Sequence, residues 1–236
     1  GPQGRPVLVQ AGSSADGRGF AARHAEAVFT AHIEKSTAQA FYADIKKRVT
    51  AEGRRPDQVL ILPGLCPTIA STDAEAKRLL LELSNYADVE IAVKYLGTWF
   101  GGHDFSHLPL DRPLTVADFP DLSHIETSKS RTEMVINLIK REEITLRELL
   151  ARFAHIGGHY LFAGTAEQVA DLIEDWFLDG AADGFNLMPP LLPTMLDIFI
   201  DEVVPLLQRR GLFRTEYQGT TLREHYGLER PPSAFA

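Results

Sequence analysis

The chain contains 236 residues, with 24 Lys and Arg against 32 Asp and Glu, a formal net charge of −8 and 44% hydrophobic residues. The hydrophobic fraction is too high for a disordered chain, so one packed globular domain is expected. An acidic chain without a Lys/Arg stripe disfavours a nucleic-acid partner, and no apolar run is long enough to cross a bilayer. With one cysteine, Cys66, and no secretory pattern at the N-terminus, we expect a reducing, cytoplasmic location.

Short apolar strands and helices alternate along the first third of the chain. The patterns predict strands over residues 6–10, 27–31 and 59–65 and helices over residues 17–26, 37–51 and 72–86. Gly53 suits the C-terminal end of the second helix, and Thr72 with Glu75 forms a capping-box pattern at the start of the third. Strands that are apolar throughout are typical of a parallel sheet covered by helices on both faces, so an α/β fold is predicted.

The alternation lapses at about residues 87–152. Glycines and prolines punctuate a polar, loop-like stretch there, followed by helical patterns over residues 131–140 and 145–153. This segment is too long for an ordinary connection, so we expect an inserted excursion with its own helices. The alternation then resumes with a strand over 160–164, a helix over 165–178, a strand over 185–188 and a helix over 195–209. The tail after Gly211 is polar and is expected to lie on the surface.

Four barrel-type strands begin near Val7, Val28, Leu60 and Phe185. They would form a sheet with two open edges, and open edges of apolar strands drive association. A complete β/α barrel has eight strands, so the chain holds about half of one. We therefore expect these strands to pair with a segment outside this chain or with a second copy of it.

Several motifs, in order along the chain, together resemble the bacterial-luciferase-like flavin monooxygenases. The resemblance is strongest with the group that oxidises nitrilotriacetate, the pristinamycin precursor and dibenzothiophene sulfone. The motifs are PVLVQAGSS (residues 6–14), GR followed by AARHAEAVF (17–29), GGHDFS (101–106), GTAEQVA (164–170), DGFNLMPP (183–190) and RRGLFRTEY (209–217).

The resemblance implies a (β/α)8 TIM barrel in which the strand ending in QAGSS opens the second half. Residues 1–236 would then be the C-terminal half-barrel, about strands 5 to 8, and the N-terminal half would be missing. It further implies an FMNH2-dependent monooxygenase that uses a flavin hydroperoxide to insert one oxygen atom into a small organic substrate. A separate NAD(P)H:flavin reductase would supply the reduced FMN, and no Gly-x-Gly-x-x-Gly fingerprint for a dinucleotide is visible in this chain.

An alternative of another class is a non-catalytic flavin-binding or assembly protein, a half-barrel that dimerises through its open sheet edges. The missing first half favours this alternative. Under both hypotheses we expect a homo-oligomer. A hydrolase on the same scaffold is disfavoured, because the sequence has no Gly-x-Ser-x-Gly elbow and no metal-ligand set.

The turn Gly12-Ser13-Ser14 is the predicted cofactor-binding site. It joins a strand to a helix, and two hydroxyl groups with the free amides of a helix N-terminus can bind an anion. The resemblance implies that this turn holds the flavin phosphate. The simpler interpretation is that Ser13 or Ser14 only caps the helix. Arg18 either adds charge to the phosphate or is a solvated helix residue.

The predicted substrate pocket draws on two strand ends. Phe29 and Ala31 end the second strand, and Asn186 and Met188 lie on the last one, at the rim where barrel enzymes place their sites. Ordinary core packing is the competing interpretation for all four.

Histidines provide the only candidate for a catalytic residue, His103, because the resembling enzymes use a histidine from this excursion in the substrate pocket. His103 with His107 and His155 with His159 are spaced like metal ligands on a helix. Gly101, Gly102 and Pro109 bracket the first pair, and Gly157 and Gly158 interrupt the second. No neighbouring carboxylate or cysteine pattern completes either set, so no metal site is expected.

Overall fold

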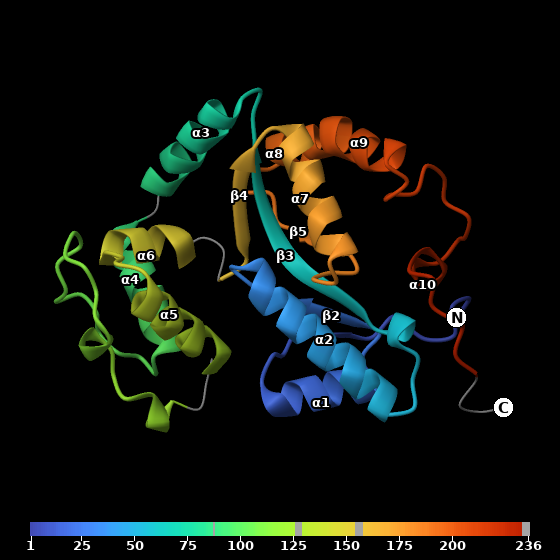
Figure 1. Cartoon of the computed structure of the whole chain (residues 1–236), viewed down its shortest axis with the longest axis horizontal. Helices are drawn as coiled ribbons and strands as arrows, with labels where there is room; N and C mark the ends of the chain where they lie inside the picture. Colours follow the sequence, from blue (N-terminus) through green and yellow to red (C-terminus); the bar gives the residue numbers. More distant parts are fainter. Residues whose placement is uncertain (87, 126–128, 154–157, 233–236) are drawn as a thin grey trace.

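The computed structural model describes residues 1–86, 88–125, 129–153 and 158–232 and shows an α/β fold with a parallel sheet (Figure 1). The strands are β1 (Val9–Gln10), β2 (Ala27–Thr30), β3 (Leu60–Ile69), β4 (Tyr160–Gly164) and β5 (Asn186–Leu187). The helices are α1 (Ala15–His24), α2 (Lys35–Ala51), α3 (Asp73–Asn85), α4 (Val89–Trp99), α5 (Lys129–Arg141), α6 (Leu146–Phe153), α7 (Ala166–Leu178), α8 (Thr194–Ile198), α9 (Val204–Arg209) and α10 (Leu222–His225).

The sheet is organised around β3, which lies at its centre. The strand order is β1-β2-β3-β4, and β5 also pairs with β3. Residues 60–63 of β3 pair with β2, residues 65–69 pair with β4, and residues 64–65 pair with β5, all in parallel. β1, β2, β3 and β5 thus correspond to the four barrel-type strands that the sequence predicts, and β4 extends the sheet along the second half of β3.

Two strand boundaries differ by more than one residue from those predicted. β3 continues to Ile69 instead of ending at Leu65, although it contains Pro63 and Pro67. The amide of Ile61 bonds to Asp183, beside β5. Because amides alternate between the two edges of a strand, both proline nitrogens face the β5 edge, where pairing is short and no amide is needed. At the N-terminus, β1 covers only residues 9–10 of the predicted 6–10.

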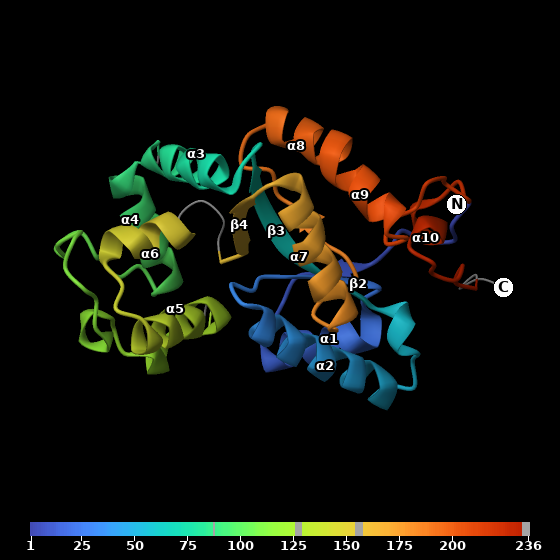
Figure 2. The same ribbon diagram turned by 45° about the horizontal axis from the view of Figure 1, so that its top comes forward.

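Helices cover the outer face of the sheet (Figure 2). Val28 of β2 and Ile61 of β3 pack against α1 and α2 in one buried cluster, and Ile69 packs against α7 and the α8–α9 segment in another. Since side chains alternate along a strand, the side chain of Phe29 on β2 lies on the opposite, inner face, and Gly64 occupies an inward-facing position on β3. The inner face of the sheet therefore carries the residues that the sequence assigned to a pocket.

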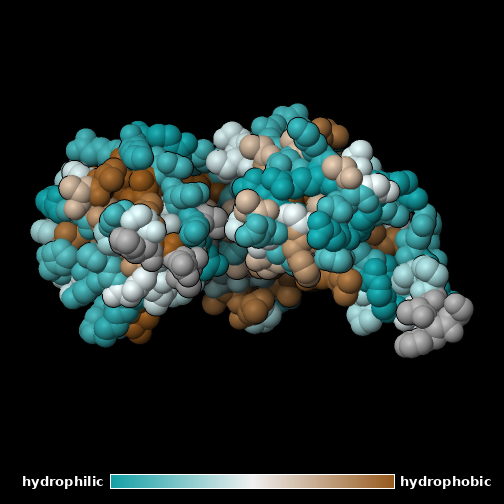
Figure 3. All heavy atoms as spheres, turned by 90° about the horizontal axis from the view of Figure 1, so that it is seen from below, coloured by the Kyte–Doolittle hydropathy of each residue, from teal (hydrophilic) through white to brown (hydrophobic). Residues whose placement is uncertain are grey.

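The segment between α3 and β4 has a hydrophobic core of its own. This core joins α4, α5 and α6 through residues such as Trp99, Val135 and Leu149. The prediction of a loop-like stretch is wrong for residues 89–99, which form α4, with the Asp88 carboxylate accepting hydrogen bonds from the amides of its first turn. Figure 3 shows this segment and the sheet with its helices as two lobes that meet at a narrowing.

The last predicted helix, residues 195–209, is irregular in its middle. α8 and α9 are joined by a π-helical segment, Phe199–Val203. Pro205, at the second position of α9, has no amide hydrogen and cannot join the regular α-helical ladder. The wider π turn just before it accommodates the interruption.

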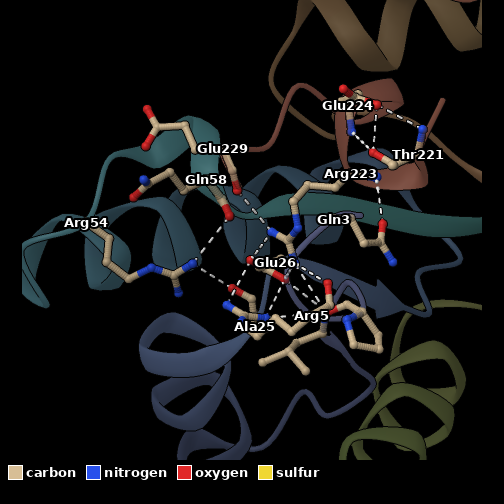
Figure 4. Close-up of polar contacts among 12 residues, drawn as sticks. Gln3, Arg5, Ala25, Glu26, Arg54, Gln58, Thr221, Arg223, Glu224 and Glu229 are labelled. Atoms are coloured by element: carbon tan, nitrogen blue, oxygen red, sulfur yellow. Dashed lines mark hydrogen bonds and ion pairs between the residues drawn. The ribbon is translucent and has the colours of Figure 1, made fainter. Parts of the chain in front are cut away.

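A buried ionic network ties the C-terminal segment to the start of the sheet (Figure 4). Arg223 of α10 is 1% exposed and donates hydrogen bonds of 2.6 and 3.0 Å to the two carboxylate oxygens of Glu26. Arg5 donates two more hydrogen bonds to this carboxylate, of 2.8 and 2.9 Å, and the amide of Leu8 donates another of 3.0 Å. Burial raises the pKa of Glu26, but these hydrogen bonds outweigh it and lower that pKa to about 2.

Candidate functional site

A cleft of about 980 Å3 lies between the sheet lobe and α5. Its lining comes from the turn after β1, the end of β2 and the loop that follows it, the first turns of α1 and α2, one side of α5, and His159 just before β4. Of the predicted site residues, Gly12, Ser13, Ser14, Phe29 and Ala31 all line this cleft. The fold thus brings the predicted phosphate turn and half of the predicted pocket together.

The Gly12-Ser13-Ser14 turn forms one end of the cleft. The Ser14 hydroxyl accepts a hydrogen bond of 3.1 Å from the amide of Gly17, so Ser14 caps α1 as the simpler interpretation held. Arg18 donates a hydrogen bond of 2.8 Å to the carbonyl of Ser13 and forms an ion pair of 3.0 Å with Asp44. The Ser13 hydroxyl makes no such contact among the described residues and lines the cleft. The helix N-terminus, the Ser13 hydroxyl and Arg18 form a donor set that fits a phosphate group.

The inner face of the sheet forms the floor beside this turn. The rings of Phe29 and His159 stack in parallel, with centroids 4.8 Å apart. Gly64 makes room for them, because a Cβ atom there would lie 2.3 Å from Nδ1 of His159 and 2.9 Å from the sulfur of Met188. Met188 therefore lies next to His159 at Gly64. The side-chain amide of Asn186 donates a hydrogen bond of 3.3 Å to the carbonyl of Leu62. Asn186 is thus satisfied by the backbone, as the competing interpretation expects.

Two buried histidines of the cleft are held in their neutral forms. Burial, aided by the positive charge of Arg18, lowers the pKa of His32 to about 4. The Thr37 hydroxyl donates to the carbonyl of Glu34, so it accepts from Nδ1 of His32, while Nε2 accepts from Thr30. Both ring nitrogens of His32 are thereby satisfied without a proton being added.

His159 is less completely satisfied. It is 8% exposed, and its Nδ1 has no hydrogen-bond partner among the described residues. Burial and the charge of Arg131 lower the pKa of His159, and a backbone hydrogen bond with Thr30 partly offsets this. Because Nε2–H donates to the backbone of Thr30, Nδ1 of the neutral imidazole can only accept a hydrogen bond.

His103 lies apart from this cleft. It lines a separate cavity in the excursion, together with Val93, Phe105 and Leu146. The ring centroids of His103 and His107 are 6.3 Å apart, and His155 is outside the described residues. Within the described part of the chain, no group of three or more His, Cys, Asp or Glu residues could hold a metal ion. No described helix is both long and apolar enough to span a membrane.

Sequence reasoning missed the roles of His159 and of α5 in this cleft. The sequence marks His159 only as one of a histidine pair, and it reaches Phe29 because β4 begins level with Leu65 of β3. A glycine inside a strand often marks the close approach of another group, so Gly64 was the available signal.

Comparison with known proteins identifies the family. Residues 1–183 match the family described as luciferase-like monooxygenase. The chain belongs to this family. It is 48% identical over 235 residues to a pristinamycin IIA synthase subunit of Streptomyces pristinaespiralis and 44% identical over 235 residues to nitrilotriacetate monooxygenase component A of Aminobacter aminovorans. Both relatives are in the group that the sequence motifs indicated, so that resemblance is confirmed.

The match extends along the whole chain but not along the whole of its relatives. It covers 100% of this chain, 54% of the first relative and 51% of the second, so the chain spans about half the length of the curated relatives it matches. The crystal structure of DmoA from Hyphomicrobium sulfonivorans superposes with a TM-score of 0.76 at 30% identity, over 100% of this chain and 54% of that one. This luciferase-like monooxygenase chain therefore has the fold of about half of such a protein.

Proposed function

We propose that this luciferase-like chain is the C-terminal half of the barrel of an FMN-dependent monooxygenase, with an insertion at about residues 87–152 before the last β/α units. The observation that carries the proposal is that the Gly12-Ser13-Ser14 turn and the stacked pair Phe29–His159 open into one cleft. An anion-binding turn beside an apolar floor suits a molecule with a phosphate at one end and a flat ring at the other.

The residues of this chain would bind and orient. Ser13 and Arg18, with the first amides of α1, would hold the phosphate, and Phe29 with Met188 would provide an apolar wall that excludes water. His159 would accept one hydrogen bond from a bound molecule. His103 lines a separate cavity, so a catalytic role for it would require the excursion to approach the cleft. Reduced FMN, when bound, activates dioxygen and supplies the oxygen atom that enters the organic substrate.

A separate flavin reductase is proposed as the source of the reduced cofactor. The described strand-to-helix turns carry no dinucleotide fingerprint, so this chain has no evident means of using a nicotinamide itself. Cys66 is a free, buried thiol whose pKa burial raises to about 11, which makes it unreactive and suits a reducing, cytoplasmic setting.

The second candidate, a non-catalytic half-barrel that self-associates, is favoured by one observation. The apolar side chains Leu8 and Val9, at the β1 edge of the sheet, are 42% and 63% exposed. An edge of this kind invites pairing with another strand. Pairing with the other half of a barrel and pairing with a second copy would both cover it.

The test uses the natural gene product that contains this chain. We expect it to retain FMN and, with a flavin reductase and NADH, to consume oxygen in the presence of a substrate. The Ser13→Ala/Ser14→Ala variant should lose FMN affinity, whereas Ser71→Ala, an exposed serine before α3, should not. Native mass spectrometry separates the candidates, because a homodimer of this chain alone that binds FMN but does not turn over supports the second.

A further inference from the structure

The lining of the cleft has the opposite charge from the rest of the protein. Its described lining includes five cationic side chains, from Arg18, Lys129, Arg131, Lys140 and Arg141, and two carboxylates, from Glu34 and Glu133. The chain as a whole carries a formal net charge of −8. A positive cleft in an acidic protein attracts anions over neutral molecules.

Most of this positive charge belongs to α5. Arg141 pairs with Glu34 and Arg18 pairs with Asp44, so the charges of these two cations are partly balanced within the protein. Lys129, Arg131 and Lys140 form no ion pair within residues 1–86, 88–125, 129–153 and 158–232. The guanidinium of Arg131 is supported by the ring of Trp99, with its central carbon 5.2 Å from the ring centroid.

The helix dipole makes two of these cations costly where they are. Lys129 and Arg131 occupy the first turn of α5, where no acidic residue is present. The N-terminus of a helix carries partial positive charge, so cations there oppose the dipole, and a bound anion would be attracted by the dipole and by both cations. Lys140, in the last turn, has the favourable orientation and needs no such explanation.

Arg131 and Arg18 act on different parts of the cleft. Met134 of α5, one turn after Arg131, lies 3.2 Å from the position of a Cβ atom on Gly158, the neighbour of His159. Arg18 instead donates a hydrogen bond to the carbonyl of Ser13, in the phosphate turn. Arg131 therefore lines the cleft beside its floor, and the phosphate turn has an arginine of its own.

We propose that the first turn of α5 is the receptor for a carboxylate group of the substrate, so that this protein acts on an organic acid rather than on a neutral molecule. Arg131 offers a planar donor pair that matches a carboxylate, and Lys129 adds a second charge beside it. This inference rests on the proposed function, since it assigns the substrate class of the same cleft.

The experiment is calorimetric titration of the natural gene product with tricarballylate and, separately, with its uncharged triamide. The wild type should bind the tricarboxylate and not the triamide. Arg131→Gln should weaken tricarballylate binding at least about tenfold, because charge-assisted hydrogen bonds are lost. Lys129→Gln should weaken it less, and Lys47→Gln, at an exposed position of α2 outside the described lining of the cleft, should leave it unchanged.

FMN affinity, measured on the same variants, separates this inference from the proposed function. We expect Arg131→Gln to leave FMN affinity within about twofold of the wild type while tricarballylate binding falls. If Arg131→Gln weakens FMN instead, α5 holds the cofactor phosphate and the inference is overturned. Equal binding of the triamide also overturns it. If FMN does not bind at all but tricarballylate binding still depends on Arg131, the proposed function fails and the anion receptor stands.

Should Arg131→Gln not fold, Arg131→Lys keeps the charge without the planar fork. Weakened binding of tricarballylate by Arg131→Lys, with an unchanged melting temperature, supports the assignment. Unchanged binding by both Arg131→Lys and Lys129→Gln overturns it.

Discussion

Replacing Glu26 by Gln tests how the buried network holds the two ends of the chain together. The carboxylate of Glu26 accepts hydrogen bonds from Arg223, Arg5 and the amide of Leu8. In Glu26→Gln the amide nitrogen faces donors, and the guanidinium of Arg223, which is 1% exposed, loses its countercharge. Removing one member of a buried pair leaves an uncompensated charge in the interior.

The expected cost can be worked out in two ways. The pKa of Glu26 is lowered from 4.5 to about 2. At 1.36 kcal/mol for each pKa unit, this corresponds to about 3 kcal/mol of stability at neutral pH. Measured losses from breaking buried ion pairs are about 3–5 kcal/mol. Because Arg5 is partly exposed, its share is screened by solvent, and we expect about 3 kcal/mol.

Urea unfolding of the chain, followed by circular dichroism, measures this loss. Glu52→Gln is the matched control, because Glu52 pairs with Arg23 on an exposed surface and should change stability little. A loss below about 1 kcal/mol for Glu26→Gln would refute the reasoning, since it lies below the range for a buried pair. Glu26→Gln and Arg223→Gln together should cost less than the sum of the two single variants.

The pH dependence follows from the direction of the same shift. A carboxyl group whose pKa is lowered on folding adds stability above its unfolded pKa of 4.5, and this stability is lost as the pH falls toward about 2. The difference in unfolding free energy between the wild type and Glu26→Gln should therefore shrink over that range. A difference that stays constant from pH 5 to pH 2 contradicts this assignment.

Two further predictions concern the floor of the cleft. Gly64→Ala places a Cβ atom 2.3 Å from Nδ1 of His159, so it should displace that ring and lower the free energy of unfolding by about 1–3 kcal/mol. Gly19→Ala is the control, because the space around Gly19 on α1 is open and the variant should not destabilise the chain. Equal melting temperatures for the two variants would exclude the close approach. His32 has its pKa lowered to about 4, so its contribution is present above its unfolded pKa of 6.5 and is lost as the pH falls toward 4. His32→Gln should flatten the stability profile in that window, and an NMR titration of His32 with a midpoint near 6.5 would show the burial argument to be wrong.

Local patterns were enough to predict most elements of the sheet and its helices. The strand at residues 160–164 has the predicted bounds, and Thr72 caps α3 through the amide of Glu75. The missed helix, α4, did carry a signal: Ala92, Leu96 and Trp99 recur at helical spacing after Asp88. Gly97 obscured it, and the structure shows why a glycine is there, since a Cβ atom would lie 2.5 Å from the carbonyl oxygen of His103.

The candidate site was only partly predictable. The phosphate turn is contiguous in sequence, so one motif carries it. The floor is not, because Phe29, Gly64 and His159 come together only through the pairing of β3 with β2 and β4. The approach of α5 to the cleft depends on how the excursion packs, and no local pattern specifies that. His103 lies in a separate cavity, so its predicted role in the active site stays a prediction.

The central claim is that the Gly12-Ser13-Ser14 turn holds the phosphate of FMN. Its most direct test compares the affinities of FMN and riboflavin, which differ only in the phosphate, by fluorescence quenching on the natural gene product. FMN should bind more tightly than riboflavin, and Ser13→Ala/Ser14→Ala should lower the FMN-to-riboflavin affinity ratio without weakening riboflavin; Arg18 and the first amides of α1 remain, so part of the preference for FMN should persist. An FMN-to-riboflavin affinity ratio that the double variant leaves unchanged would place the phosphate elsewhere and contradict the account.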